Sequence, residues 1–125
     1  MTAKFCLLMG SLGGLLGVVL GAFGSHGLKT RLSADMLAVW HTAVEYQFYH
    51  SLALIGVGLL LIQHNQAQLA SWAGLAFAIG ILLFCGSLYV LALSGIKPLG
   101  AITPIGGLSF IIGWALLIAA VVKLG

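Results

Sequence analysis

The chain has 125 residues, of which 62% are hydrophobic and only 6% are charged. A typical soluble domain is about 25% charged, so this composition excludes a water-soluble globular protein and predicts the lipid bilayer as the surroundings of the chain. The formal net charge of +3 comes from a few basic residues scattered along the sequence, which fits contact with lipid headgroups and argues against nucleic acid as a partner.

The first apolar stretch, residues 5–24, predicts a transmembrane helix. No charged residue lies between Lys4 and Lys29, and about 20 apolar residues are needed to span a bilayer. The apolar core of a cleaved secretory signal is only about 7–15 residues long, so an uncleaved span is favoured. Glycines recur here at helical spacing, which in lipid lets another helix approach closely and predicts a packing seam within the bundle or between subunits. The glycines of this seam are Gly10, Gly14, Gly17, Gly21 and Gly24.

Residues 33–45 predict an amphipathic helix that leads into the second span. Their apolar side chains recur at helical spacing, and Ser33 can cap the first turn. We expect this segment to continue into the membrane as one oblique helix. Three aromatic residues would then mark the membrane interface. These are Trp40, Tyr46 and Tyr49.

Three further spans are predicted at residues 46–63, 69–93 and 104–122. The polar run 64–68 interrupts a long uncharged stretch and predicts a tight turn between the second and third spans. Thr103 is the expected N-cap of the fourth span, because the proline that follows it suits the first helical position.

These elements predict an all-α fold: an integral membrane four-helix bundle in which residues 1–125 form a single transmembrane domain. An amphipathic lead-in precedes the second transmembrane helix. Lys29 and Arg31 lie in the first loop and Lys97 in the third. Since cytoplasmic loops carry an excess of Lys and Arg, loops one and three are expected on the cytoplasmic side.

Polar side chains that could carry chemistry gather in residues 24–28 and 40–50. On a helix, His41, Glu45 and Tyr49 share one stripe, which could relay protons or cations. The alternative is that Glu45 is an interfacial acid, hydrogen-bonded to neighbouring side chains. The sequence contains no paired Glu-x-x-His motif, Cys/His metal cluster or nucleophile motif, so neither metal ligands nor catalytic residues are predicted.

His50 is expected inside the hydrocarbon region, where an ionisable side chain normally faces a partner or a cavity. Its simplest role is a neutral imidazole bonded across helices to Ser87 or Tyr89. A bis-histidine haem would need His26 and His50 to meet, which requires the loop after the first span to fold back. No cofactor is therefore predicted.

Motifs along nearly the whole chain match those of a known family. They are residues 21–28 (GAFGSHGL), 40–50 (WHTAVEYQFYH), 83–89 (LFCGSLY), 104–107 (PIGG) and 113–114 (GW). Together they make the chain similar to the YgdD-like family of small inner-membrane proteins, catalogued as domain of unknown function 423, which is also similar to animal transmembrane protein 256. The resemblance implies a multi-pass protein of the cell inner membrane with four spans and no established activity.

The same resemblance marks polar positions that we expect to form one internal cluster, to which the relay stripe adds its acid. The predicted cluster consists of His26, Glu45, Tyr46, Gln47, His50, Ser87 and Tyr89.

Three functions remain open at this point. The favoured one is a non-enzymatic helix-packing or assembly module, which forms a homo-oligomer or packs against another membrane protein. It is motivated by the glycine seam and by the near absence of residues outside the membrane. The alternatives are a small proton, ion or solute channel or carrier, and a protein that binds a lipid, quinone or haem. The sequence favours no reaction.

Overall fold

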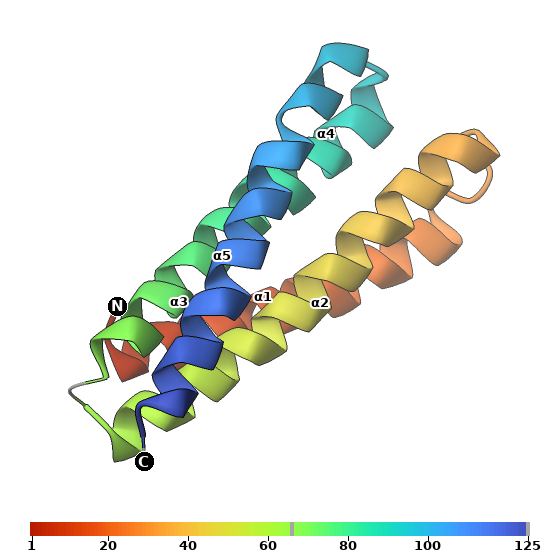
Figure 1. Cartoon of the computed structure of the whole chain (residues 1–125). Helices are drawn as coiled ribbons and strands as arrows, with labels where there is room; N and C mark the ends of the chain where they lie inside the picture. The colour runs from red at the N-terminus through yellow and green to blue at the C-terminus, as the bar shows by residue number, and fades with distance from the viewer. Residues whose placement is uncertain (66, 125) are drawn as a thin grey trace.

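The computed structural model describes residues 1–65 and 67–124, and within them the chain forms two helical hairpins (Figure 1). The first hairpin pairs α1 (Ala3–His26) with α2 (Ala34–Gln63). In the second, α3 (Gln68–Gly80), the π-helical turn η1 (Ile81–Cys85) and α4 (Gly86–Ser94) follow one another without interruption. After the short 3₁₀ helix η2 (Lys97–Ala101), α5 (Thr103–Val122) returns alongside them.

Among the described residues, four segments are long and apolar enough to cross a bilayer, which confirms the predicted all-α membrane four-helix bundle. Both termini lie at the same end of the molecule, together with the turn that joins the two hairpins (Figure 1). The spans are Ala3–His26, Ala34–Gln63, Gln68–Ser94 and Lys97–Val122.

The start of α2 confirms the predicted cap, because the backbone N–H of Met36 donates to Ser33 Oγ over 3.2 Å. From there α2 runs for 30 residues without a break. At about 1.5 Å per residue such a helix exceeds the roughly 30 Å hydrocarbon core, so it must tilt or extend beyond the core. The amphipathic lead-in and the second span are therefore one helix.

Two local predictions were wrong. Trp40 is only 2% exposed, and its indole N–H donates to the carbonyl of Leu20 over 2.9 Å, so it packs inside the first hairpin instead of marking an interface. Thr103 is the first residue of α5 and forms no capping bond. Its hydroxyl lies 2.7 Å from Ser87 Oγ, where it links α5 to α4.

The predicted turn at residues 64–68 lies between the end of α2 at Gln63 and the start of α3 at Gln68. His64 caps the end of α2 through its backbone N–H, which donates to the carbonyl of Leu60. Gln66 lies outside the described residues.

Within the first hairpin, glycines of α1 lie against large side chains of α2. A methyl group on Gly17 would come within 2.8 Å of the Phe48 ring, and one on Gly24 within 2.6 Å of Trp40. Gly10 is equally tight against α2, whereas Gly14 meets nothing within 4 Å. Close approach without side chains is how membrane helices gain dispersion contacts. Part of the glycine seam is thus occupied inside the chain.

The second hairpin uses the same device. A methyl group on Gly113 of α5 would come within 2.7 Å of Phe77 of α3, and one on Gly80 would collide with Phe110. Gly106 of α5 lies directly against the backbone of Phe84 in η1. A side chain at any of these positions would force the two helices apart.

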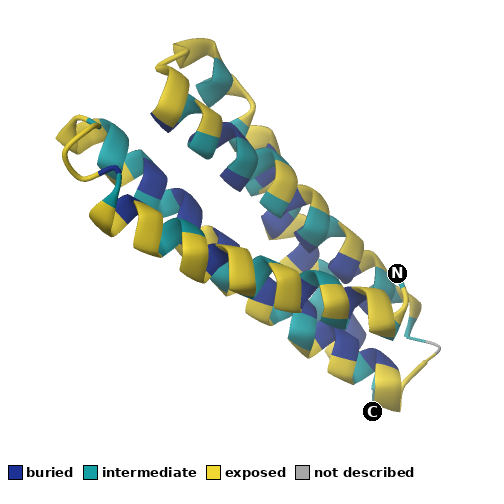
Figure 2. Cartoon of the chain, turned by 180° about the vertical axis from the view of Figure 1, so that it is seen from behind, coloured by how far each residue is buried: buried dark blue, intermediate teal, exposed yellow. Residues whose placement is uncertain are grey.

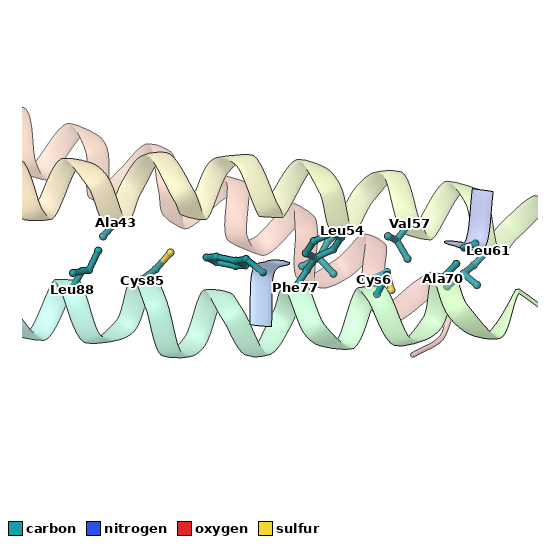
Figure 3. Packing of buried hydrophobic residues seen from close by; sticks show 12 residues of the cluster. Cys6, Ala43, Leu54, Val57, Leu61, Ala70, Phe77, Cys85 and Leu88 are labelled. Carbon is teal, nitrogen blue, oxygen red and sulfur yellow. The ribbon is translucent and has the colours of Figure 1, made fainter. Parts of the chain in front are cut away.

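The two hairpins meet through an apolar core, in which side chains of α2 point toward those of the α3–α4 segment (Figure 3). Exposed residues cover the outward faces of the helices, where they meet lipid (Figure 2). The labelled core residues are Cys6, Ala43, Leu54, Val57, Leu61, Ala70, Phe77, Cys85 and Leu88.

Candidate functional site

The structure separates the predicted polar residues into groups on different faces of α2. On the face toward α1 and α4, the side-chain amide of Gln47 is 4% exposed and bonded at both ends. Its Nε2 donates to the carbonyl of Gly13 over 2.8 Å, and its Oε1 accepts a 2.6 Å bond from the hydroxyl of Tyr89. The Tyr89 ring lies edge-on to Trp40, with centroids 4.7 Å apart. This group links three helices.

His50 lies on another face of α2 and is also 4% exposed. Its Nδ1 lies 2.8 Å from the carbonyl oxygen of Tyr46, and the indole N–H of Trp114 donates to its Nε2 over 3.0 Å. A carbonyl only accepts and an indole N–H only donates, so both bonds are satisfied only by the neutral imidazole with its hydrogen on Nδ1. The partners are not the predicted Ser87 and Tyr89.

Three of the predicted residues lie apart from both groups. Ser87 Oγ donates to the carbonyl of Phe84 over 3.0 Å and contacts Thr103, so it joins α4 to α5. His26 is the exposed last residue of α1, and Glu45 is exposed on α2. The structure therefore brings together Gln47 with Tyr89, and Tyr46 with His50, but does not unite all seven residues.

Aromatic rings surround His50. Its imidazole stacks on Phe110 with centroids 3.5 Å apart and planes within 9°. Beside it Tyr46 stacks on Phe84 at 4.6 Å, and Trp114 meets Phe77 edge-on at 5.0 Å. Rings at such separations attract one another beyond simple burial. They form a continuous aromatic wall that joins α2, α3, η1 and α5.

The π-helical turn η1 helps to build this wall. Phe84 belongs to η1, and its backbone touches Gly106 of α5, which has no side chain to prevent that approach. A π-helical turn inserts an extra residue into a helical ladder and is frequent at functional sites. Here it places the Phe84 ring against Tyr46.

A cleft of about 740 Å³ lies along the aromatic wall, between α2 and α5. We call it the α2–α5 cleft. None of its lining residues is charged, and six carry an aromatic or imidazole ring. Because exposed residues of membrane-spanning helices border it, the cleft opens toward lipid. It is lined by Tyr46, Tyr49, His50, Phe84, Pro104, Gly107, Leu108, Phe110, Ile111 and Trp114.

A second, smaller cleft of about 270 Å³ lies between α1, α2 and the η1–α4 segment, where Gln47 and Tyr89 face residues of α1 and η1. Its polar groups are already bonded to one another, and the remainder of its lining is almost entirely apolar. The larger cleft is therefore the stronger candidate for a functional site.

The role of a metal or haem ligand does not fit His50. Both ring nitrogens of His50 already have partners, so neither is available to a metal ion. Within residues 1–65 and 67–124, no three His, Cys, Asp or Glu side chains lie close enough to share a metal ion.

Sequence reasoning missed Phe84, Phe110 and Trp114 as members of the site. A signal was available for Trp114, since an indole N–H within a span must find an acceptor and His50 was the obvious candidate at membrane depth. For Phe84 and Phe110 no such signal existed, because an apolar ring in an apolar span looks like any other.

Comparison with known proteins shows the family. The model of the family described as "Protein of unknown function (DUF423)" matches residues 20–107, more than half of the chain. This chain belongs to the DUF423 family. The matched region contains most of the α2–α5 cleft, including His50 and Phe84, and ends before Trp114.

Similar full-length proteins support the assignment to DUF423. The UPF0382 membrane protein SSP2132 of Staphylococcus saprophyticus is 44% identical over 121 residues, which cover 97% of this chain and 99% of that protein. The UPF0382 membrane protein YwdK of Bacillus subtilis is 44% identical over 120 residues, covering 96% and 98%. No solved structure matches the chain.

Proposed function

We propose that this membrane protein is a non-enzymatic binding module that takes up a lipid-soluble molecule in the α2–α5 cleft. The observation that carries the proposal is an uncharged, ring-lined cleft of about 740 Å³ that opens toward lipid. Small-molecule sites are typically clefts of about 300–1,000 Å³, lined by apolar and aromatic side chains with a few polar groups. The hydroxyls of Tyr46 and Tyr49 supply those polar groups.

Binding fits the site better than catalysis. A general base needs a free ring nitrogen within reach of a substrate proton, but both nitrogens of His50 are engaged by Tyr46 and Trp114. The buried cysteines, Cys6 and Cys85, lie in the apolar core and not in the cleft.

Binding also fits better than ion conduction. An ion pathway needs polar side chains that follow one another through the bundle. Most side chains buried between α2 and the α3–α4 segment are apolar (Figure 3), and the polar pair Gln47 and Tyr89 is already bonded to itself and to the backbone of Gly13. Glu45 and Tyr49 of the predicted relay stripe are exposed on α2, outside this core.

Self-association is a second candidate, favoured by one face of α1. A methyl group on Gly14 would meet nothing within 4 Å, and one on Gly21 would make only an ordinary contact. These two glycines alternate with the exposed Ser11, Val18 and Ser25 at spacings of three and four residues. Such a strip lets a second copy approach closely. Crosslinking in native membranes tests this: dimers lost in Gly14→Leu support it, and a monomer under all conditions rejects it.

For membrane placement we propose the inner membrane with loops one and three in the cytoplasm. The support is the basic charge of those loops, which contain Lys29, Arg31 and Lys97. Single cysteines introduced into each loop, with Cys6 and Cys85 buried, can be labelled by an impermeant maleimide. If loops one and three were labelled in intact cells, they would lie outside the cytoplasm and the proposed orientation would be wrong.

The binding proposal is tested by native mass spectrometry of protein released from its own membranes. We expect a retained small molecule in the wild type and its loss in Gly107→Leu, whose side chain would project into the cleft. A methyl group on Gly107 would lie an ordinary 3.7 Å from Phe84, so the first carbon of the new side chain fits without a clash. Gly56→Leu, which adds the same side chain on an exposed face of α2, is the matched control. Equal ligand content in all three proteins would reject the proposal.

A further inference from the structure

We propose that the molecule bound in the α2–α5 cleft is a lipid-soluble quinone, with its ring against the aromatic wall and its isoprenoid tail in the bilayer. This inference rests on the proposed binding function and specifies the chemical class of the ligand. Three properties of the cleft carry it: the absence of charge, the stacked rings and the unused phenol hydroxyls.

The absence of charged residues in the α2–α5 cleft favours a ligand with an uncharged head group. None of the ten lining residues is Lys, Arg, Asp or Glu. An unpaired phosphate or ammonium group brought from the headgroup layer into such a cleft would lose its hydration without gaining a counter-charge. A phospholipid or a charged solute is therefore a poor occupant, whereas a quinone has a neutral head.

The stacked rings of the aromatic wall favour a ligand with a flat head group. His50 and Phe110 are stacked within 9°, and Tyr46 and Phe84 are stacked within 30°. Tyr46 remains 37% exposed, so part of its surface is available for stacking with a further ring. Offset stacking of flat conjugated rings is favourable, which a prenyl or acyl chain cannot reproduce.

The hydroxyls of Tyr46 and Tyr49 favour a ligand that carries hydrogen-bond acceptors. Tyr46 and Tyr49 have ring centroids 5.7 Å apart, and both line the cleft. Neither hydroxyl bonds to another residue in the described part of the chain, whereas His50 is bonded to the carbonyl of Tyr46 and to the indole of Trp114. A phenol can donate to a carbonyl oxygen, and a quinone ring presents two such oxygens.

The isoprenoid tail of the ligand can extend from the cleft into the bilayer. Leu108 and Ile111 of α5 line the cleft and are 57% and 66% exposed, so they border the cleft where it meets lipid. An isoprenoid chain can leave between them without burying any polar group. The flat head and the apolar tail of a quinone thus match the two parts of the cleft.

Trp114 supplies a direct probe, because a quinone quenches tryptophan fluorescence at contact distance. Trp72 is 51% exposed and Trp114 is 43% exposed, so a quinone in the bilayer can quench both by collision. The titration therefore uses the Trp72→Phe protein in phospholipid nanodiscs, and the saturating part of the Trp114 quenching measures binding. Trp40 is buried on the other face of α2. The probe is a benzoquinone with a ten-carbon tail, and we expect quenching that saturates at one quinone per protein.

Variants assign the binding to the cleft. Loss of one hydrogen bond in Tyr46→Phe or Tyr49→Phe should raise the Kd about five- to tenfold. Tyr89→Phe removes the same kind of hydroxyl outside the α2–α5 cleft and should leave the Kd unchanged. Circular dichroism and gel filtration establish that each variant is folded.

Competition separates this inference from the binding proposal on which it rests. A prenyl alcohol of matched tail length should fail to displace the quinone. If it competes equally well, the quinone assignment is wrong while cleft binding stands. Quenching that rises linearly with the quinone content of the membrane, and that is the same in Tyr46→Phe and Tyr89→Phe, also overturns the assignment. If native mass spectrometry then finds no bound molecule of any kind, the proposed function fails as well.

Discussion

Gln47 and His50 lie three residues apart on α2, yet their surroundings differ in kind. Gln47 joins α2 to the backbone of α1 and to Tyr89 of α4, beside a cleft of about 270 Å³. His50 is held just as firmly, but it borders a cleft of about 740 Å³ whose two tyrosines are exposed. A polar group bonded inside a packed region stabilises the packing. A polar group bonded in the wall of an open cleft holds the side chains that line the cleft in place. Under the proposed function, one face of α2 therefore serves stability and the other serves binding.

The largest effect is expected where the wall of the cleft is most tightly packed. A methyl group on Gly106 would collide with the backbone of Phe84, whereas one on Gly107 makes an ordinary contact. Overpacking that a backbone must absorb costs about 3 kcal/mol. Gly106→Ala should therefore lower the free energy of unfolding by about that amount, measured by SDS titration with circular dichroism, and Gly107→Ala should not. If Gly106→Ala and Gly107→Ala were equally stable, the backbone of η1 would be able to shift and the aromatic wall would not be rigid.

Gln47→Leu tests the packing face. It removes both bonds of the amide and leaves the carbonyl of Gly13 and the hydroxyl of Tyr89, which are partly buried, without this partner. Buried groups left unsatisfied cost about 1–3 kcal/mol, so a loss near 2 kcal/mol is expected. Ligand binding should persist in the folded fraction. A variant of normal stability that had lost its ligand would reverse the assignment of the two faces.

Compared with Gln47→Leu, Trp114→Phe should lower the stability of the protein less and weaken ligand binding more. It keeps most of the ring contact with Phe77 but removes the donor to His50. One neutral hydrogen bond contributes about 1 kcal/mol, which sets the expected loss in the same unfolding assay. Trp72→Phe, at an exposed position, is the control. If both variants unfold alike, the bond between Trp114 and His50 adds nothing to the wall.

Ser51→Ala should raise stability. The hydroxyl of Ser51 is fully buried and has no hydrogen-bond partner among residues 1–65 and 67–124, and it lies against Gly13 of α1. Removing an unsatisfied buried hydroxyl should stabilise the packing face by up to about 1 kcal/mol in SDS titration. A loss of stability would mean that an ordered water or a shifted backbone carbonyl satisfies Ser51.

Features that depend on local chemistry were predictable from the sequence, and features that depend on a neighbouring helix were not. The four spans follow from runs of apolar residues, and the cap at Ser33 follows from its own hydroxyl. Trp40 was misplaced because its burial depends on the space that Gly24 leaves on α1. Thr103 was misassigned as a cap because its hydroxyl bonds instead to Ser87, 16 residues away.

The candidate site could be predicted in its residue types but not in its arrangement. His50 was predicted because an ionisable side chain is costly in lipid, and Tyr46 because it matches a polar position of the family that the chain resembles. Their separation from Gln47 depends on which helix packs on each face of α2, and hydropathy carries no such information. The π-helical turn η1 has no sequence signal of its own here, although it places Phe84 in the wall.

The most direct test of a binding face on α2 is photolabelling in the membrane, with labelled residues mapped by mass spectrometry. A quinone that carries a diazirine should label Tyr49, Leu108 and Ile111 around the α2–α5 cleft, and unmodified quinone should suppress that labelling. Labels spread evenly over the outward residues of α1 and α5, unchanged by competitor, would contradict the account, because the cleft would then hold only ordinary bilayer lipid.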